Sequence, residues 1–216
     1  MTKRLHPALI LIDLETTGLD PNLHEIVDTC AIILSRKLEH IAKFHALSYP
    51  DYPRRASPKA LEINGYTKEE WSIKGAITQK ELAHTFSDFI YNTLGSKSDN
   101  VRLIPVGHRI RFDTGFIGKL MENHGLEIPM DTRRFIDTLV LEDCIRVAKS
   151  IAEDKCSRSS PKSFERLAAT YNVSMGNECH TAEGDVAATL KVLRKQIDLI
   201  TKGVGRRHRQ KQRRKK

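Results

Sequence analysis

Two acidic side chains follow an apolar run near the start of the chain and could share a metal ion. The run Ala8–Ile12 (ALILI) predicts a strand that is buried on both faces, and Asp13 and Glu15 are expected on the same strand, where it reaches the surface at its C-terminal end. Because side chains two residues apart leave the same face of a strand, these carboxylates can converge on one point. Like charges that close repel unless a cation lies between them. An isolated pair of this spacing is more often a solvated acidic turn, so the pair needs support from elsewhere in the chain.

Three further side chains of suitable chemistry lie at predicted helix starts. Asp113 opens a helix that follows a short apolar stretch, where an acid is also favoured because it caps free N–H groups. Asp185 lies next to the apolar stripe of a later helix. His180 lies at the entrance of that helix, and an imidazole titrates near neutral pH, as a general base requires. Each of the three also has an ordinary structural explanation when it is taken alone.

The elements that must position these side chains begin as a strand meander and then alternate strands with helices. Further strands are expected at Glu25–Leu34, around Lys43–Ser48, at Val101–Val106 and at Arg134–Asp137, and helices at Ser57–Ile63, Thr78–Leu94, Phe112–Asn123, Thr138–Ile151, Ser163–Tyr171 and Thr181–Ile200. Thr78 with Glu81 three residues later predicts a capping box. The serine-rich stretch Glu153–Pro161 predicts a surface loop. This order predicts an α/β fold with a mixed sheet.

Three motifs connect the separate residues. The chain carries DLETTG at 13–18, GHRIRFD at 107–113 and HTAEGD at 180–185. In this order they resemble the DEDDh branch of the exonuclease superfamily, which includes polymerase proofreading exonucleases and ribonuclease T. The resemblance extends from about Leu9 to Leu193. It implies a ribonuclease H-like fold, with a mixed five-stranded sheet that has its second strand antiparallel and is flanked by helices.

The resemblance also implies a metal-dependent 3′ to 5′ exonuclease with four acidic ligands and one histidine. By position, Asp13, Glu15, Asp113 and Asp185 correspond to the ligands of two divalent cations, Mg²⁺ or Mn²⁺, and His180 corresponds to the general base. Carboxylate oxygens suit these hard cations, and two such ions can activate an attacking water and stabilise the departing 3′ oxygen. The product would be a nucleoside 5′-monophosphate. All five residues are therefore candidates for catalysis.

Four more residues are candidates for substrate binding. Thr16 and Thr17 resemble the family's contacts to the terminal nucleotide, although a preference for turns explains them equally well. The segment Ile63–Thr67 (INGYT) resembles one that lines the family's substrate groove, and Tyr66 in it could stack on a base or simply anchor the loop. Arg109 stands where family members commonly have asparagine, and it could bind phosphate or face solvent.

The excess positive charge of the chain lies in its last residues. Nine of the 36 Lys and Arg residues lie between Lys202 and Lys216, which leaves 27 basic against 27 acidic residues in the rest of the chain. We expect an exonuclease domain over residues 1–201 and a disordered basic tail over residues 202–216. The basic tail could attract nucleic-acid phosphates or act only in solubility or localisation, and a polyanionic substrate favours the first.

Composition predicts a globular protein without a membrane segment. Hydrophobic residues make up 39% and charged residues 29% of the chain, as in ordinary soluble domains. No apolar run approaches the roughly 18 residues that span a bilayer, and Met1–Pro7 is too short and polar for a signal peptide. We therefore expect a cytoplasmic, intracellular protein. The four cysteines show no CxxC pair or zinc-ligand spacing, which predicts reduced thiols.

Three functions fit these observations. The leading hypothesis is an exonuclease that degrades single-stranded DNA in proofreading or repair, with a DNA polymerase as a candidate partner. The second is an exoribonuclease that trims RNA, because nothing in the sequence identifies the sugar. The third is a non-catalytic nucleic-acid-binding or polymerase-associated module on the same fold. The complete set of four acids and one histidine argues against the third, because clustered acids without metal ions destabilise a fold through repulsion.

Overall fold

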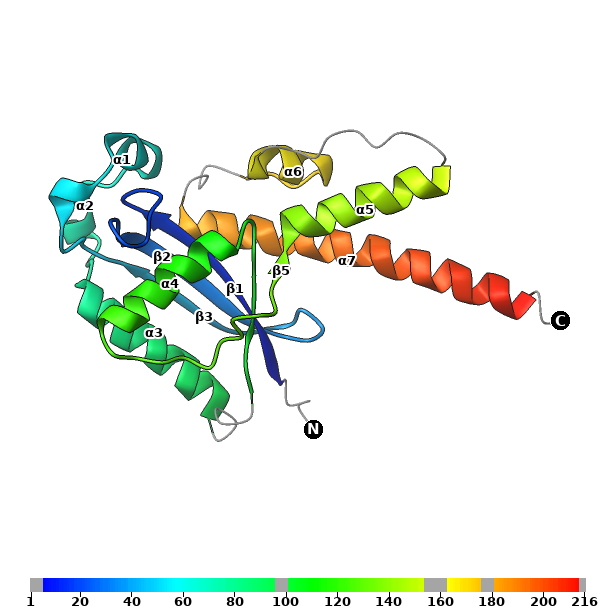
Figure 1. Ribbon diagram of the computed structural model, residues 1–216, viewed down its shortest axis with the longest axis horizontal. Coiled ribbons are helices and arrows are strands. Elements are labelled where there is room, and N and C mark those ends of the chain that lie inside the picture. Colours follow the sequence, from blue (N-terminus) through cyan, green and yellow to red (C-terminus); the bar gives the residue numbers. More distant parts are fainter. Residues whose placement is uncertain (1–5, 96–100, 154–162, 176–180, 214–216) are drawn as a thin grey trace.

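A mixed five-stranded sheet forms the centre of the chain. The computed structural model describes residues 6–95, 101–153, 163–175 and 181–213, with residues 203–213 described as backbone only. The strands are β1 (Pro7–Thr16), β2 (Ile26–Ser35), β3 (His40–Leu47), β4 (Ile104–Gly107) and β5 (Ile136–Asp137), in the spatial order β3-β2-β1-β4-β5 (Figure 1). β2 runs antiparallel to both its neighbours, whereas β4 runs parallel to β1 and to β5. The expected ribonuclease H-like α/β architecture is confirmed.

Helices cover both faces of this sheet. They are the short 3-10 helix η1 (Pro53–Arg55), α1 (Pro58–Asn64), α2 (Lys68–Ile73), α3 (Gln79–Leu94), α4 (Arg111–Asn123), α5 (Thr138–Glu153), α6 (Phe164–Thr170) and α7 (Ala182–Arg213). α3 and α4 cover one face, where Phe86 and Ile117 pack with Ile10 of β1 in the main core. α7 covers the opposite face over Leu9 and Leu11, and α6 packs against α7. Alternate residues of β1 therefore bury their side chains in two different cores.

β1 continues beyond the apolar run and carries the acidic pair, as the sequence analysis expected. Pairing with β2 continues to Thr16, where Glu15 lies opposite Asp28. Polar residues at the end of a strand do not interrupt the backbone ladder, so the strand can continue past the apolar run. Asp13 and Glu15 continue the alternation that places Leu11 under α7. Both carboxylates therefore leave the sheet on the α7 side.

The predicted capping box is present at the start of α3, whereas α2 was not predicted. The Thr78 side chain accepts a hydrogen bond from the N–H of Glu81, and the Glu81 carboxylate accepts one from the N–H of Thr78. α2 is too short to show helical periodicity in the sequence. It is capped by the Thr67 side chain and anchored by buried Trp71, whose indole N–H donates to the Val27 carbonyl at 2.6 Å.

Helix α7 corrects the expectation for the basic tail. The sequence predicted a helix that ends near Ile200 and a disordered segment after it, but α7 continues without a break to Arg213 (Figure 1). Arg, Lys and Gln are good helix formers and no proline interrupts them, so a helix that is already formed can propagate into polar sequence. A segment without apolar periodicity is not expected to pack against the core, but it can still be helical. The division at residue 201 stays a prediction.

Two smaller expectations concern cysteines and membranes. Cys30 is a buried free thiol and Cys144 an exposed one, while the other two cysteines lie outside the described residues. Most of the loop expected at Glu153–Pro161 also lies outside them. Within the described part of the chain, no helix has both the length and the apolar character to cross a bilayer.

Candidate active site

Three acidic side chains meet at the carboxyl end of β1. One carboxylate oxygen from each of Asp13, Glu15 and Asp185 lies within 4.8 Å of the other two. The strand supplies the first two, and the first turn of α7 supplies the third. The structure thus brings together residues that are far apart in the sequence but that the motifs nominated together.

Asp113 lies at the start of α4 beside this cluster. Its side chain is buried, and its carboxylate accepts a hydrogen bond from the backbone N–H of Leu14 in β1. Gly107, at the end of β4, permits this approach, because a Cβ there would lie 3.0 Å from the Ile12 carbonyl oxygen. A glycine at this position lets β4 end tightly against β1. The helix that follows therefore begins next to Asp13.

Burial and mutual repulsion make these carboxyl groups hard to ionise. Burial is the largest cause that raises the pKa of Asp13 well above its ordinary value, followed by the charges of Asp113, Asp185 and Glu15. Burial, and then the charges of Asp185, Asp28 and Asp113, raises the pKa of Glu15 to about 8. The pKa of Asp113 is also raised well above its usual range, chiefly by burial. Carboxyl groups with strongly raised pKa values cluster at functional sites, so this set marks a candidate active site.

The donor set fits a divalent cation. Carboxylate oxygens are the ligands that Mg²⁺ and Mn²⁺ prefer, and a cation between the acids would favour their charged forms. Burial and the charges of neighbouring acids are the causes that raise the pKa of Asp13 and Glu15. A cation bound between the carboxylates would offset this repulsion.

The candidate general base, His180, lies outside the described residues. The chain is described again from Thr181, whose hydroxyl accepts a hydrogen bond from the N–H of Gly184 at 3.1 Å. Its carbonyl accepts one from the N–H of Asp185 at 3.0 Å. Thr181, the residue after His180, thus holds the turn that carries Asp185 through these two hydrogen bonds. The catalytic role of His180 stays a prediction.

A fifth acid, Asp28, lies next to the cluster, and the sequence analysis missed it. One carboxylate oxygen accepts a hydrogen bond from the N–H of Ala182 at 3.1 Å, and the other lies 3.0 Å from Nε2 of His45. Asp28 therefore ties the first residue of α7, and with it Asp185, to β2 beside Glu15. One signal was present in the sequence, because an acid within an otherwise apolar strand seldom lacks a partner.

The start of α7 is also held from β3. Glu183 forms an ion pair with Lys43 and lies 3.9 Å from the ring of His45. The hydrogen bond with Asp28 is the largest cause that raises the pKa of His45. The hydrogen bond from Lys43 lowers the pKa of Glu183. Contacts from two strands thus fix the turn that presents Asp185.

This anchor predicts a difference between two variants of Asp28. Asp28→Ala leaves the buried N–H of Ala182 without its acceptor, which costs about 1–3 kcal/mol. Asp28→Asn keeps an amide oxygen in the same place and should retain most of that stability. Urea denaturation in EDTA is expected to show the alanine variant less stable than the asparagine variant by about 1–2 kcal/mol. Equal stability of the two variants would contradict the anchoring role.

Thr16 and Thr17 hold the loop that follows β1. The Thr16 hydroxyl donates to the Gly18 carbonyl at 2.6 Å, and the Thr17 hydroxyl accepts from the N–H of Glu25 at 2.9 Å. Both side chains are buried, and the Thr16 carbonyl accepts a hydrogen bond from the Asn64 side chain at 3.0 Å. These contacts agree with the turn explanation. Their contact with a terminal nucleotide stays a prediction.

Tyr66 packs within its own loop, and Arg109 lies in a tight turn. The ring of Tyr66 packs edge-on against Trp71, with ring centroids 5.2 Å apart, which anchors its loop. Arg109 is exposed and has a φ of 57°, in the left-handed region that asparagine adopts more readily than most residues. The turn beyond it is fixed by Asp137, whose carboxylate accepts a hydrogen bond from the N–H of Ile110 at 3.2 Å. Substrate binding by Tyr66 or Arg109 stays a prediction.

Comparisons with known proteins agree with this site. The exonuclease family model RNase_T matches residues 10–193. The chain is 29% identical over 147 residues to a PolC-type DNA polymerase III of Thermotoga petrophila, a match that covers 68% of this chain and 10% of the polymerase. It is 26% identical over 137 residues to ribonuclease T of Vibrio vulnificus, which covers 61% of this chain and 63% of that protein.

The fold also matches a solved exonuclease. Exonuclease I of E. coli, in complex with a dT13 oligonucleotide, aligns with a TM-score of 0.65 and 18% sequence identity over 90% of this chain and 42% of exonuclease I. This chain therefore spans about a tenth of the polymerase and less than half of exonuclease I. Because the family model covers most of its length, this chain belongs to the DEDDh family of 3′ to 5′ exonucleases.

Proposed function

We propose that this chain hydrolyses phosphodiester bonds at the 3′ end of single-stranded DNA and releases nucleoside 5′-monophosphates. The observation that carries this proposal is the convergence of Asp13, Glu15 and Asp185, with Asp113 beside them, in a chain of this family. A non-catalytic binding module would gain nothing from a buried cluster of acids whose ionisation is costly without cations.

The four acids would hold two divalent cations, Mg²⁺ or Mn²⁺. When bound, the cations supply Lewis-acid stabilisation of the charge that develops on the phosphate and the departing 3′ oxygen. Asp13 and Glu15 are positioned by the β1–β2 ladder, and Asp185 is positioned by the contacts of Asp28 with the start of α7. His180 would accept the proton of the attacking water, since an imidazole can do so near neutral pH.

Single-stranded DNA is the proposed substrate, in a proofreading or repair role. The matches to PolC-type DNA polymerases and to a structure of exonuclease I with an oligothymidylate support DNA, and association with a DNA polymerase is part of the proposal. The match to ribonuclease T supports the RNA-trimming alternative. The basic tail would add nonspecific attraction to the phosphate backbone, because the rest of the chain carries balanced charge.

Digestion of paired DNA and RNA strands tests this proposal. With Mg²⁺, we expect a higher kcat/KM on a single-stranded DNA oligonucleotide than on an RNA oligonucleotide of the same sequence. A higher value on RNA would support the exoribonuclease alternative. Degradation of neither strand, combined with binding of both, would contradict the enzymatic proposal and support a binding module.

A further inference from the structure

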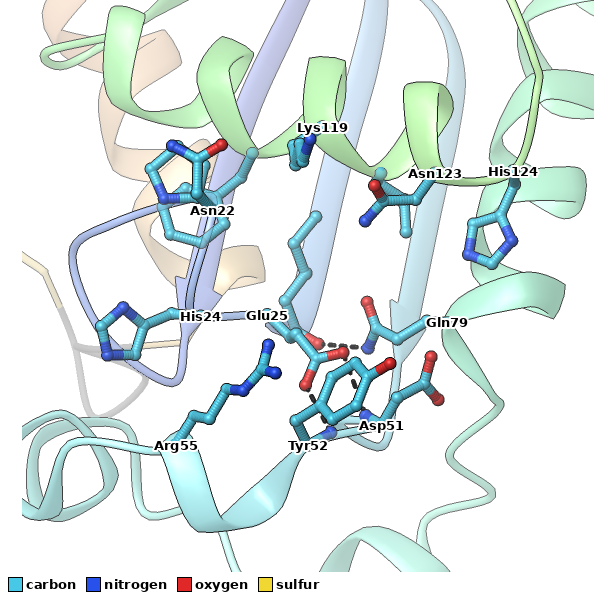
Figure 2. Close-up of a pocket in the computed structure, with 14 residues that line it drawn as sticks. Asn22, His24, Glu25, Asp51, Tyr52, Arg55, Gln79, Lys119, Asn123 and His124 are labelled. Carbon is cyan, nitrogen blue, oxygen red and sulfur yellow. Dashed lines mark hydrogen bonds between the residues drawn. The ribbon is translucent and has the colours of Figure 1, made fainter.

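A cavity lies beside the loop that follows β1. It has a volume of about 440 Å³ and is enclosed by that loop, by η1, by the first residue of α3 and by the C-terminal half of α4 (Figure 2). The side chains that matter most around it are those of Asn22, Glu25, Tyr52, Arg55, Gln79 and Asn123. This volume falls in the range of about 300–1,000 Å³ that is typical of sites for small ligands.

Glu25 fixes one wall of this cavity. Its carboxylate accepts hydrogen bonds from the backbone N–H groups of Asp51 at 3.1 Å and Tyr52 at 2.8 Å. The segment that contains η1 is thereby held against the start of β2. On this segment, the guanidinium of Arg55 lies 4.1 Å from the centroid of the Tyr52 ring. Tyr52 is still 56% exposed, so part of the ring remains open to a ligand.

Gln79 supplies a fixed acceptor at the base of the cavity. The side chain is only 4% exposed, and its amide nitrogen donates to the carbonyls of Ile26 and Tyr49, both at 2.8 Å. Because the nitrogen is held on one side, the amide oxygen points into the cavity (Figure 2). An amide oxygen that faces the cavity can accept a hydrogen bond from water or from a ligand.

These groups together fit a nucleotide better than a simple anion or an apolar molecule. An aromatic ring with a guanidinium beside it can bind an unpaired base and its phosphate. The amides of Asn22 and Asn123, together with the amide oxygen of Gln79, offer donors and acceptors of the kind that base edges require. The lining carries both acidic and basic side chains, among them Glu25, Arg55 and Lys119, so it is not a site for an anion alone. An apolar ligand would leave the Gln79 oxygen without a donor.

Helix α4 connects this cavity with the acidic cluster. Asp113 lies in its first turn, while Phe116 and Asn123 are among the residues that line the cavity. At the helical rise per residue, the lining begins about 5 Å beyond Asp113 along the axis and ends about 15 Å beyond it. Between the two sites, the loop passes close to α4, with Pro21 3.8 Å from where a Cβ of Gly115 would lie. The loop thus lies between the two sites, and a nucleic acid strand that uses both would pass over it.

We propose that the cavity is a subsite for a nucleotide of the strand that is being cut, on the 5′ side of the scissile bond. The inference rests on the proposed function, because an enzyme that acts at a 3′ terminus has the rest of the strand only on the 5′ side. A strand that is too short to pass over the loop cannot use the subsite. Tyr52 and Arg55 should therefore increase the affinity for long strands and leave the affinity for short strands unchanged.

Substrates of two lengths test this subsite. We expect the double variant Tyr52→Ala with Arg55→Ala to raise the KM for a single-stranded decanucleotide by about tenfold, within the range that base–aromatic stacking contributes. Its kcat on the decanucleotide, and both constants on a dinucleotide, should equal those of the wild type. Arg36→Ala is the matched control, because Arg36 is an exposed arginine in the turn after β2. It should leave all these constants unchanged.

A binding measurement supplies a readout without turnover. In an Asp13→Asn background, fluorescence anisotropy with a labelled decanucleotide should show about tenfold weaker binding when both Tyr52 and Arg55 are replaced. Equal losses of affinity for the dinucleotide and the decanucleotide would indicate damage to the catalytic site and would overturn the subsite. An unchanged affinity for both would also overturn it. Failure of the proposed function would be seen separately, because the wild type would then cut neither substrate. The anisotropy would still decide the subsite in that case.

Discussion

Asp13→Asn is expected to lower the rate of 3′-terminal hydrolysis by about a thousandfold or more. This corresponds to roughly 4 kcal/mol of lost transition-state stabilisation, as expected when a metal site loses a ligand. Asp13 is central to the cluster, because the charges of Asp113, Asp185, Glu15 and Asp28 all raise its pKa. Steady-state kinetics on a DNA oligonucleotide would measure the loss. Asp88→Asn, which neutralises an exposed acid on α3, should retain the wild-type rate.

Asp13→Asn should also be more stable than the wild type when divalent cations are removed. Asparagine has nearly the same shape as aspartate but removes one of the repelling charges. Thermal unfolding in EDTA should therefore show a higher Tm for Asp13→Asn than for the wild type. A lower Tm together with lost activity would indicate a general folding defect and contradict a metal-binding role for Asp13.

The second large effect is a loss of stability with rising pH in protein that has been stripped of divalent cations. The pKa of Glu15 is about 8 in the folded protein against an ordinary 4.5, so the folded state keeps a proton that the unfolded state has already released. Stability is then fully present below about pH 4.5 and is lost as the pH rises toward 8. The loss from Glu15 alone is on the order of 4 kcal/mol. His45 also has a raised pKa and contributes in the same direction.

Urea denaturation at several pH values, with and without Mg²⁺, measures this effect. In EDTA, the free energy of unfolding should fall between pH 5 and pH 8, and Glu15→Gln should flatten the decline. Added Mg²⁺ should stabilise the protein more at pH 8 than at pH 5, because protons compete with the cation for the carboxylates. A flat pH profile, or equal stabilisation by Mg²⁺ at both pH values, would contradict the raised carboxyl pKa values.

Local signals predicted much of the fold. The apolar run at Ala8–Ile12 indicated the central strand, and the Thr78–Glu81 capping box indicated the start of α3 within one residue. Such signals depend only on residues that are close together in the sequence, so they can be recognised without the tertiary structure. The same dependence explains two errors, because α2 is too short for periodicity and α7 propagates beyond its apolar face to Arg213.

The candidate site was predicted as a set of residues, but its supporting contacts were not. The motifs nominated Asp13 and Asp185, and the period of a strand placed Asp13 and Glu15 on one face. The role of Asp28 could not be predicted from local sequence, because its contact with Ala182 joins residues 154 positions apart. This contact exists only when β2 lies beside the start of α7. The cavity at Gln79 likewise forms only where a loop, η1 and two helices meet.

A time course on 5′-labelled single-stranded DNA tests the central claim most directly. With Mg²⁺, the wild type should shorten the labelled strand step by step and release nucleoside 5′-monophosphates, while EDTA or Asp13→Asn should stop the reaction. Immediate release of the labelled 5′ nucleotide, cuts within the strand, or undiminished activity in EDTA would contradict a metal-dependent 3′ to 5′ exonuclease built on these acids.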